Sequence, residues 1–250
     1  MKKERCLIIR RGTFRRPAIR SLVVVASSLI AVGVAVGLGN PVLVLADEDQ
    51  LNAVPFTFVG KAADCTPSPA GSRIVTARWL GGMGLPDNGG PNTTANKDDR
   101  HTGLLLSKNG LTADCSSAGA RIEGGVKGMT VTSTFHVGFD YRNGGHCGAG
   151  APRFNIDTDM GFFFVGCANA PQGPAPQDPD QWTRTSSVLT TCGSECFPGP
   201  IPEGAKIKSI TIIFDEGTDT ANNDTQGVGL AVMDNIDIND VLITREGAGD

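Results

Sequence analysis

Hydrophobic and polar residues alternate over short stretches of this chain, and no long segment after residue 46 places apolar residues at helical spacing. Glycine, proline, asparagine and aspartate interrupt the alternation about every eight to twelve residues. Alternation with a period of two is typical of β-strands that bury one face. The pattern predicts about eleven strands: Val54–Gly60, Ser72–Leu80, Thr102–Lys108, Gly119–Gly124, Met129–Tyr141, Arg153–Asp157, Gly161–Cys167, Trp182–Thr190, Ala205–Gly217, Gly227–Asn235 and Ile236–Thr244.

The longest predicted strand, Met129–Tyr141, has two distinct faces. We expect one face to enter the core and the other to meet solvent or a ligand. In Ala205–Gly217 the alternation likewise directs Ile210, Ile212 and Phe214 inward. The core set of the longest strand is Val131, Ser133, Phe135, Val137, Phe139 and Tyr141, and the outward set is Thr132, Thr134, His136, Gly138 and Asp140.

The number of short strands favours two packed antiparallel sheets over a parallel sheet with helices. The predicted fold is therefore all-β, a two-sheet antiparallel β-sandwich. Two polar stretches, Gly81–His101 and Ala168–Gln181, are predicted to be loops, and the second holds four prolines in 14 residues. Loops of this length in a compact domain are functional or mobile.

The first 46 residues form a separate segment. Eight Lys or Arg and one Glu precede the apolar run that starts at Ser21, and the segment ends in Val44-Leu45-Ala46. A basic head, an apolar middle and small residues before a cut are the parts of a secretory signal peptide, with cleavage after Ala46. The alternative is an uncleaved membrane anchor. Either arrangement exports residues 47–250, which we expect to form a single domain, secreted or at the cell surface.

Charge restricts the partners of the exported part. Residues 47–250 hold 14 Lys or Arg and 25 Asp or Glu, a net charge of −11 with neutral histidines. Nucleic acid and anionic membranes require a basic footprint, so neither is an expected partner, and membrane contact is expected only through an uncleaved N-terminal segment. Metal cations are compatible with this charge.

Six cysteines remain after residue 46, an even number that favours three disulfides in an exported chain. The preferred pairing is Cys65 with Cys115, Cys147 with Cys167, and Cys192 with Cys196. The alternative is a zinc site, but the chain has no CxxC pair.

The stretch DYRNGGHCGAGAPRFNID, 140–157, combines glycines with a His-Cys pair. A dinucleotide fingerprint needs a third glycine three residues after Gly150, where this chain has Arg153 followed by a strand. A thiol nucleophile needs a base, but neighbours in an extended chain project to opposite sides, so His146 does not serve Cys147. We expect a glycine-permitted turn that a disulfide at Cys147 pins.

Carboxylates gather in two segments near the carboxyl end. Hard oxygen ligands of this kind suit calcium, and the candidate ligands are Asp215, Asp219, Asp234 and Asp237. The alternative is that they are solvated turn residues. Asp215, Glu216 or Asp234 would also serve a glycosidase, which needs two acids across a cleft. In the last predicted strand, oxygen-bearing side chains alternate with isoleucines and form a row: Asn235, Asp237 and Asn239.

A second polar row, Arg153, Asn155 and Asp157, is the candidate ligand-binding site, with an ordinary solvated sheet face as the alternative. Sugar binding uses aromatic platforms, but Trp79, Trp182, Tyr141 and the phenylalanines are expected to pack in the core or at its rim.

The segment SITIIFDEGTDTANNDTQGVGLAVMDNIDINDVLI, 209–243, resembles the last strands of jelly-roll domains, including carbohydrate-binding-like modules, and GHCGAGAPRFN resembles a stretch of uncharacterised exported bacterial proteins. The departure is Asn239-Asp240, where such domains often turn on Asn-Gly. The resemblance implies a jelly-roll-like sandwich. We expect a non-catalytic binding or cell-surface module whose ligand is a glycan, calcium or an envelope component. The alternatives are a secreted hydrolase acting on glycans and a structural envelope protein.

Overall fold

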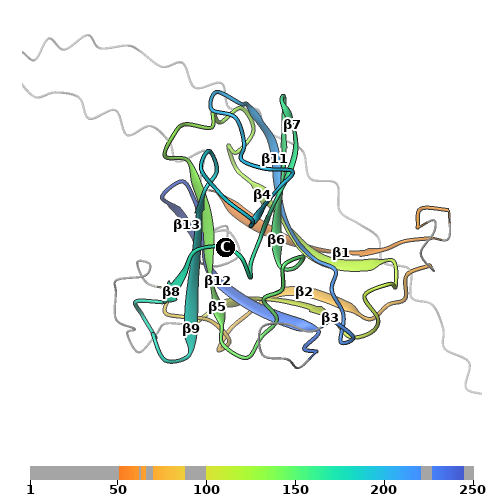
Figure 1. The fold of residues 1–250 in the computed structure, drawn as a ribbon. Helices are drawn as coiled ribbons and strands as arrows, with labels where there is room; N and C mark the ends of the chain where they lie inside the picture. Colours follow the sequence, from red (N-terminus) through yellow and green to blue (C-terminus); the bar gives the residue numbers. More distant parts are fainter. Residues whose placement is uncertain (1–50, 62, 66–69, 88–99, 221–226, 245–250) are drawn as a thin grey trace, which may run out of the picture. The chain divides into compact units, whose positions relative to one another are not determined.

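The structure, a computed structural model, describes residues 51–61, 63–65, 70–87, 100–220 and 227–244. Within these ranges the chain forms thirteen strands and no helix, and their course can be followed in Figure 1. All strand pairings are antiparallel, and the strands form two sheets, as the alternation predicts. The predicted signal segment, 1–46, lies outside the described residues.

The six-stranded sheet has the order β1-β4-β11-β6-β7-β10. Strands distant in the sequence are therefore neighbours, and β11 joins β4 to β6. The bounds are β1 (Asn52–Val59), β4 (Ser116–Glu123), β6 (Arg153–Thr158), β7 (Gly161–Gly166), β10 (Cys196–Phe197) and β11 (Ile207–Phe214).

The seven-stranded sheet has the order β2-β3-β12-β5-β9-β8, with β13 paired to β12. Two of its strands are only three residues long. β8 lies in the predicted loop Ala168–Gln181, and β13 lies in the predicted longer strand Ile236–Thr244. The bounds are β2 (Val75–Leu80), β3 (Gly103–Lys108), β5 (His136–Arg142), β8 (Gln172–Pro174), β9 (Trp182–Val188), β12 (Leu230–Ile238) and β13 (Val241–Ile243).

One hydrophobic core contains side chains of both sheets. Ile210, Ile212 and Phe214 of β11 point into it, as predicted. The rings of Phe139 on β5 and Phe154 on β6 lie 5.7 Å apart across the core. Burial of such side chains is the main favourable term in folding and holds the two sheets together.

The predicted strand Met129–Tyr141 is shorter than expected, because β5 begins only at His136. A turn precedes it, in which the amide of Phe135 donates to the carbonyl of Thr132 at 3.1 Å. Val131 and Phe135 still reach the core, but Ser133 is exposed.

The outward face of this strand is exposed only at its start, since Thr132 and Thr134 meet solvent, whereas Gly138 and Asp140 are buried. Asp140 is fully buried, and both its carboxylate oxygens accept hydrogen bonds from Arg184 at 2.7 Å. The described parts of the two predicted loops cover this side of the seven-stranded sheet, with Leu85 and Ala175 packing against Trp182 of β9. Residues 88–99 of the first loop lie outside the described residues. The outer face of the six-stranded sheet is therefore the better candidate for a ligand.

The closing segment forms two strands, as predicted, but the break between them lies at Asn239 and Asp240 and not after Asn235. β12 continues through Asn235, whose φ of 42° marks a bulge between Asp234 and Asp237. The bulge removes Asn235 from the expected oxygen row, because it buries that side chain while Asp237 stays partly exposed. The turn to β13 places Asn239 and Asp240 at φ of 53° and 70°, so aspartate occupies the position where glycine is common.

All three predicted disulfides are confirmed: Cys65–Cys115, Cys147–Cys167 and Cys192–Cys196. The second ties the glycine-rich loop to the end of β7. Three disulfides in a domain of this size are consistent with an extracellular protein.

Removal of a disulfide should destabilise the protein more, the longer the loop that the disulfide closes. The cysteines are 50, 20 and 4 residues apart, so Cys→Ala pairs should lower the free energy of unfolding by about 4, 3 and 2 kcal/mol, respectively. Urea unfolding of the three double variants measures this. A largest loss for Cys192 and Cys196 would contradict it.

Candidate binding surface and adjoining pocket

The outer face of the six-stranded sheet carries the predicted row of Arg153, Asn155 and Asp157. These three side chains of β6 are partly exposed, whereas Phe154 and Ile156 between them are buried. The polar row therefore points away from the core.

Three phenylalanine rings extend this row sideways across the sheet. Asn155 is opposite Phe164 of β7, which is opposite Phe197 of β10. Phe162 and Phe197 are 48% and 67% exposed, and their ring centroids lie 5.1 and 6.2 Å from that of Phe164. We call Phe162, Phe164 and Phe197 the phenylalanine cluster. Grouped apolar side chains on a protein surface mark interaction sites.

Arg153 connects the polar row to the end of β11. Its Nη1 and Nη2 donate to the two carboxylate oxygens of Asp215 at 2.6 and 2.8 Å, and Nη1 also donates to the carbonyl of Gly150 at 2.6 Å. Its Nε donates to Oδ1 of Asn155 at 3.0 Å, and its guanidinium lies 5.4 Å from the centroid of the Phe164 ring. Most of its donors are engaged, so Arg153 positions its neighbours.

Asp157 ends the polar row in a more open setting. Its Oδ1 lies 3.6 Å from Nζ of Lys208, and both side chains are well exposed. Such surface pairs contribute little to stability and separate easily, so Asp157 is accessible to a ligand.

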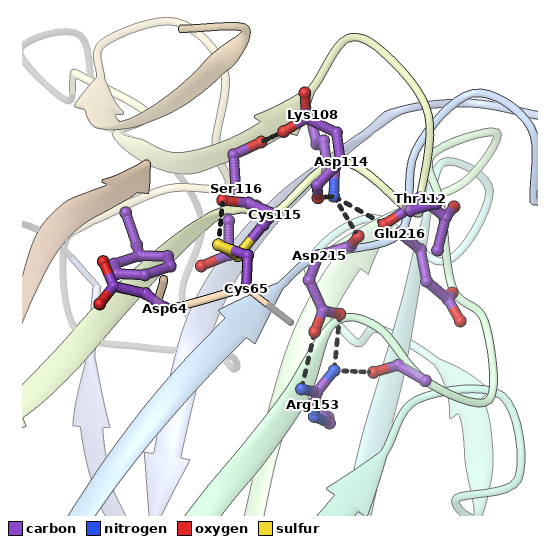
Figure 2. A pocket seen from close by; sticks show the side chains of 14 residues that line it. Asp64, Cys65, Lys108, Thr112, Asp114, Cys115, Ser116, Arg153, Asp215 and Glu216 are labelled. Carbon is purple, nitrogen blue, oxygen red and sulfur yellow. Dashed lines mark hydrogen bonds and ion pairs between the residues drawn. A yellow bond between two sulfur atoms is a disulfide. The ribbon is translucent and has the colours of Figure 1, made fainter. Parts of the chain in front are cut away.

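A pocket of about 510 Å³ adjoins this face where β1 and β11 end and where β4 and β6 begin (Figure 2). Asp215 and Arg153 lie in its wall, so the pocket and the polar row share residues. The charged and aromatic side chains that line it include Phe58, Asp64, Asp114, Arg153, Asp215 and Glu216.

Lys108, at the end of β3, contributes a buried ammonium group to the pocket wall. Its Nζ donates to the main-chain carbonyls of Thr112, Asp114 and Asp215 at 3.0, 2.5 and 3.0 Å, among the residues that Figure 2 shows. Burial lowers the pKa of Lys108, and the nearby carboxylates oppose that shift. This ammonium holds the loop before β4 against the end of β11.

Glu216 explains the glycines of the GHCGAG stretch. Its Oε2 lies 2.6 Å from Nε2 of His146, which is fully buried. A Cβ atom at Gly148 or Gly150 would lie 2.3 or 2.4 Å from an oxygen of this carboxylate. The glycines therefore leave room for the Glu216 carboxylate, in addition to allowing the turn that the sequence predicts.

The four predicted calcium ligands are engaged separately. Asp215 binds Arg153, Asp219 accepts from Thr112, and Asp237 lies 3.2 Å from His136. Both oxygens of Asp234 accept backbone amides, those of Leu85 and Asn235, at 2.6 Å. Across the described ranges, no three His, Cys, Asp or Glu residues have the arrangement of a metal site. Calcium binding stays a prediction.

The phenylalanine cluster was not predicted as a binding feature. The three consecutive phenylalanines of β7 could have predicted it, because strand alternation buries Phe163 and places Phe162 and Phe164 on the outer face. Phe197 lies in a two-residue strand too short for any pattern. Trp79 and Trp182 are buried, as expected, and offer no platform.

A comparison with protein-family models finds none that matches this chain, and a comparison with curated proteins finds no similar sequence. Within the ranges given above, no helical segment has the length and apolar character that a membrane crossing requires.

Asp234 should make the protein less stable as pH rises. Burial raises the pKa of Asp234 in the folded state well above the ordinary value of 3.8. Between the pKa of the unfolded state and that of the folded state, the folded protein therefore binds more protons than the unfolded protein. The free energy of unfolding of the wild type, relative to Asp234→Asn, should therefore fall as pH increases above about 4. Urea unfolding at a series of pH values measures the difference. Two parallel curves would contradict this assignment.

Proposed function

We propose that this protein is an exported, non-catalytic module that binds a glycan on the outer face of its six-stranded sheet. The observation that carries the proposal is the phenylalanine cluster beside the polar row of β6. Sugar rings present apolar C–H faces and hydroxyl edges, which pack on aromatic rings and bond to neighbouring polar groups, respectively.

The dimensions of this surface support an extended ligand. Neighbouring strands are about 4.8 Å apart, so the path from Asn155 through Phe164 to Phe197 covers about 10 Å across the sheet. The β-sheet fixes the backbone of this surface, and Arg153 contacts the side chains of Asn155 and Phe164. These side chains are therefore ordered before a ligand arrives, which reduces the entropic cost of binding.

A hydrolase on the same surface is the alternative. Of the acids that it would use, Asp215 is paired with Arg153 and Glu216 with His146. These contacts favour a positioning role for both carboxylates, and hence binding over hydrolysis.

Removal of a ring or of the central amide should weaken glycan binding. Phe197→Ala should reduce affinity about tenfold, because an exposed aromatic contact is lost, and Asn155→Ala about threefold, because one hydrogen bond is lost. Glycan-array screening followed by titration calorimetry on the best ligand measures both.

The matched control is Leu230→Ala, which truncates a 38% exposed side chain on the other sheet and should leave affinity unchanged. Thermal melting of each variant verifies folding. An equal loss of affinity in Leu230→Ala would overturn the proposal. Hydrolysis of the glycan that depends on Asp215 or Asp234 would also overturn it.

A further inference from the structure

We propose that the pocket at the end of the outer face binds a primary ammonium group, and that the glycan is a polysaccharide of amino sugars with free amines. The inference rests on the glycan-binding function proposed above and specifies the ligand's chemistry. Its basis is the charge, the hydrogen-bond balance and the aromatic wall of the pocket.

Negative charge exceeds positive charge in the pocket lining. The lining has four carboxylates, Asp64, Asp114, Asp215 and Glu216, against the two cations Lys108 and Arg153. Burial opposes ionisation of Asp114, but hydrogen bonds from Ser116 and Ser72 outweigh it and lower its pKa. A cationic ligand would offset this excess.

The donors of the two lining cations are nearly all engaged. The three N–H groups of Lys108 match the three carbonyls that it contacts, and Arg153 uses four of its five N–H groups on Gly150, Asn155 and Asp215. The lining carboxylates already have partners, Lys61 for Asp64, Ser72 and Ser116 for Asp114, Arg153 for Asp215, and His146 for Glu216. A carboxylate has about four acceptor sites, however, so donors from a ligand can fill those that remain. An ammonium group brings three donors and the complementary charge.

An aromatic wall completes the pocket. Phe58 of β1 is 44% exposed and lines it. Cations already lie over rings elsewhere on this sheet, since the guanidinium groups of Arg121 and Arg153 are each 5.4 Å from a phenylalanine centroid, those of Phe56 and Phe164. An ammonium beside Phe58 would gain the same attraction.

The pocket and the phenylalanine cluster are contiguous through Arg153. Its guanidinium binds Asp215 in the pocket wall and also lies over Phe164 of the cluster. One oligosaccharide can therefore place an amine in the pocket and a neighbouring ring on the cluster.

Three hexasaccharides test the inference on the full exported chain: glucosamine, N-acetylglucosamine and glucose oligomers, titrated at about pH 5.5, where carboxylates are ionised and amines are protonated. The glucosamine hexamer should bind at least fivefold more tightly than the other two. Equal affinity for all three overturns the ammonium site and leaves glycan binding standing. Binding of none overturns the amino-sugar assignment, and absence of any ligand on the glycan array overturns the proposed function as well.

Two double variants assign the effect to the pocket. Asp64→Asn with Asp114→Asn removes two lining charges and should abolish the preference for glucosamine. Asp180→Asn with Glu203→Gln removes two exposed charges outside the pocket and should preserve it. Phe58→Leu keeps an apolar wall without a ring and should reduce the preference about twofold.

Spermidine distinguishes a polysaccharide from a small amine. It should bind much more weakly than the glucosamine hexamer, because it contacts only the pocket. If it binds more tightly and still depends on Asp64 and Asp114, the polysaccharide assignment is wrong. Loss of preference in the Asp180 and Glu203 variant would also overturn the pocket assignment, since it would show an effect of net charge alone.

Discussion

The paired hydrogen bonds between Arg153 and Asp215 determine the geometry of the candidate site. They join the first residue of β6 to the residue that follows β11, and the same guanidinium orients Asn155 and lies over Phe164. A lysine would supply one point charge without the planar fork, so it would not hold these groups together. The polar row, the phenylalanine cluster and the pocket wall are thus parts of one arrangement.

The two sheets differ in what covers their outer faces, and this difference places the binding surface. A second apolar cluster over the seven-stranded sheet contains Leu85, Ala175 and Trp182. Asp140 is buried on the same side and pairs with Arg184. The six-stranded sheet instead exposes Phe162 and Phe197. An exposed aromatic surface opposes solubility unless it has a partner, so this sheet is the one on which we propose a binding function.

The fold was largely predictable because strand alternation and cysteine parity are local properties of the sequence. The sandwich follows from alternation and the number of disulfides from the even cysteine count, whereas their pairing was a choice among fifteen connectivities. Contacts between distant segments were not predictable: the cover over Asp140 comes from two loops, and His146 meets Glu216 from 70 residues away. The bulge at Asn235 also escaped prediction, since alternation has no signal for one extra residue. Alternation within β6 was enough to predict that the polar row lies on one face. The phenylalanine cluster was not predictable in the same way, because it depends on which strands are neighbours in the sheet.

The GHCGAG stretch shows how a local motif depends on a distant carboxylate. Its composition indicates a tight turn, and the Cys147–Cys167 disulfide pins that turn to β7. Gly148 and Gly150, however, leave the space that the Glu216 carboxylate occupies, and the carbonyl of Gly150 also accepts from Arg153. A Cβ atom at either glycine would meet this carboxylate, so the Glu216 side chain would have to move away from His146. The loop therefore borders the candidate binding surface, where it contacts Glu216 and, through Arg153, Asp215.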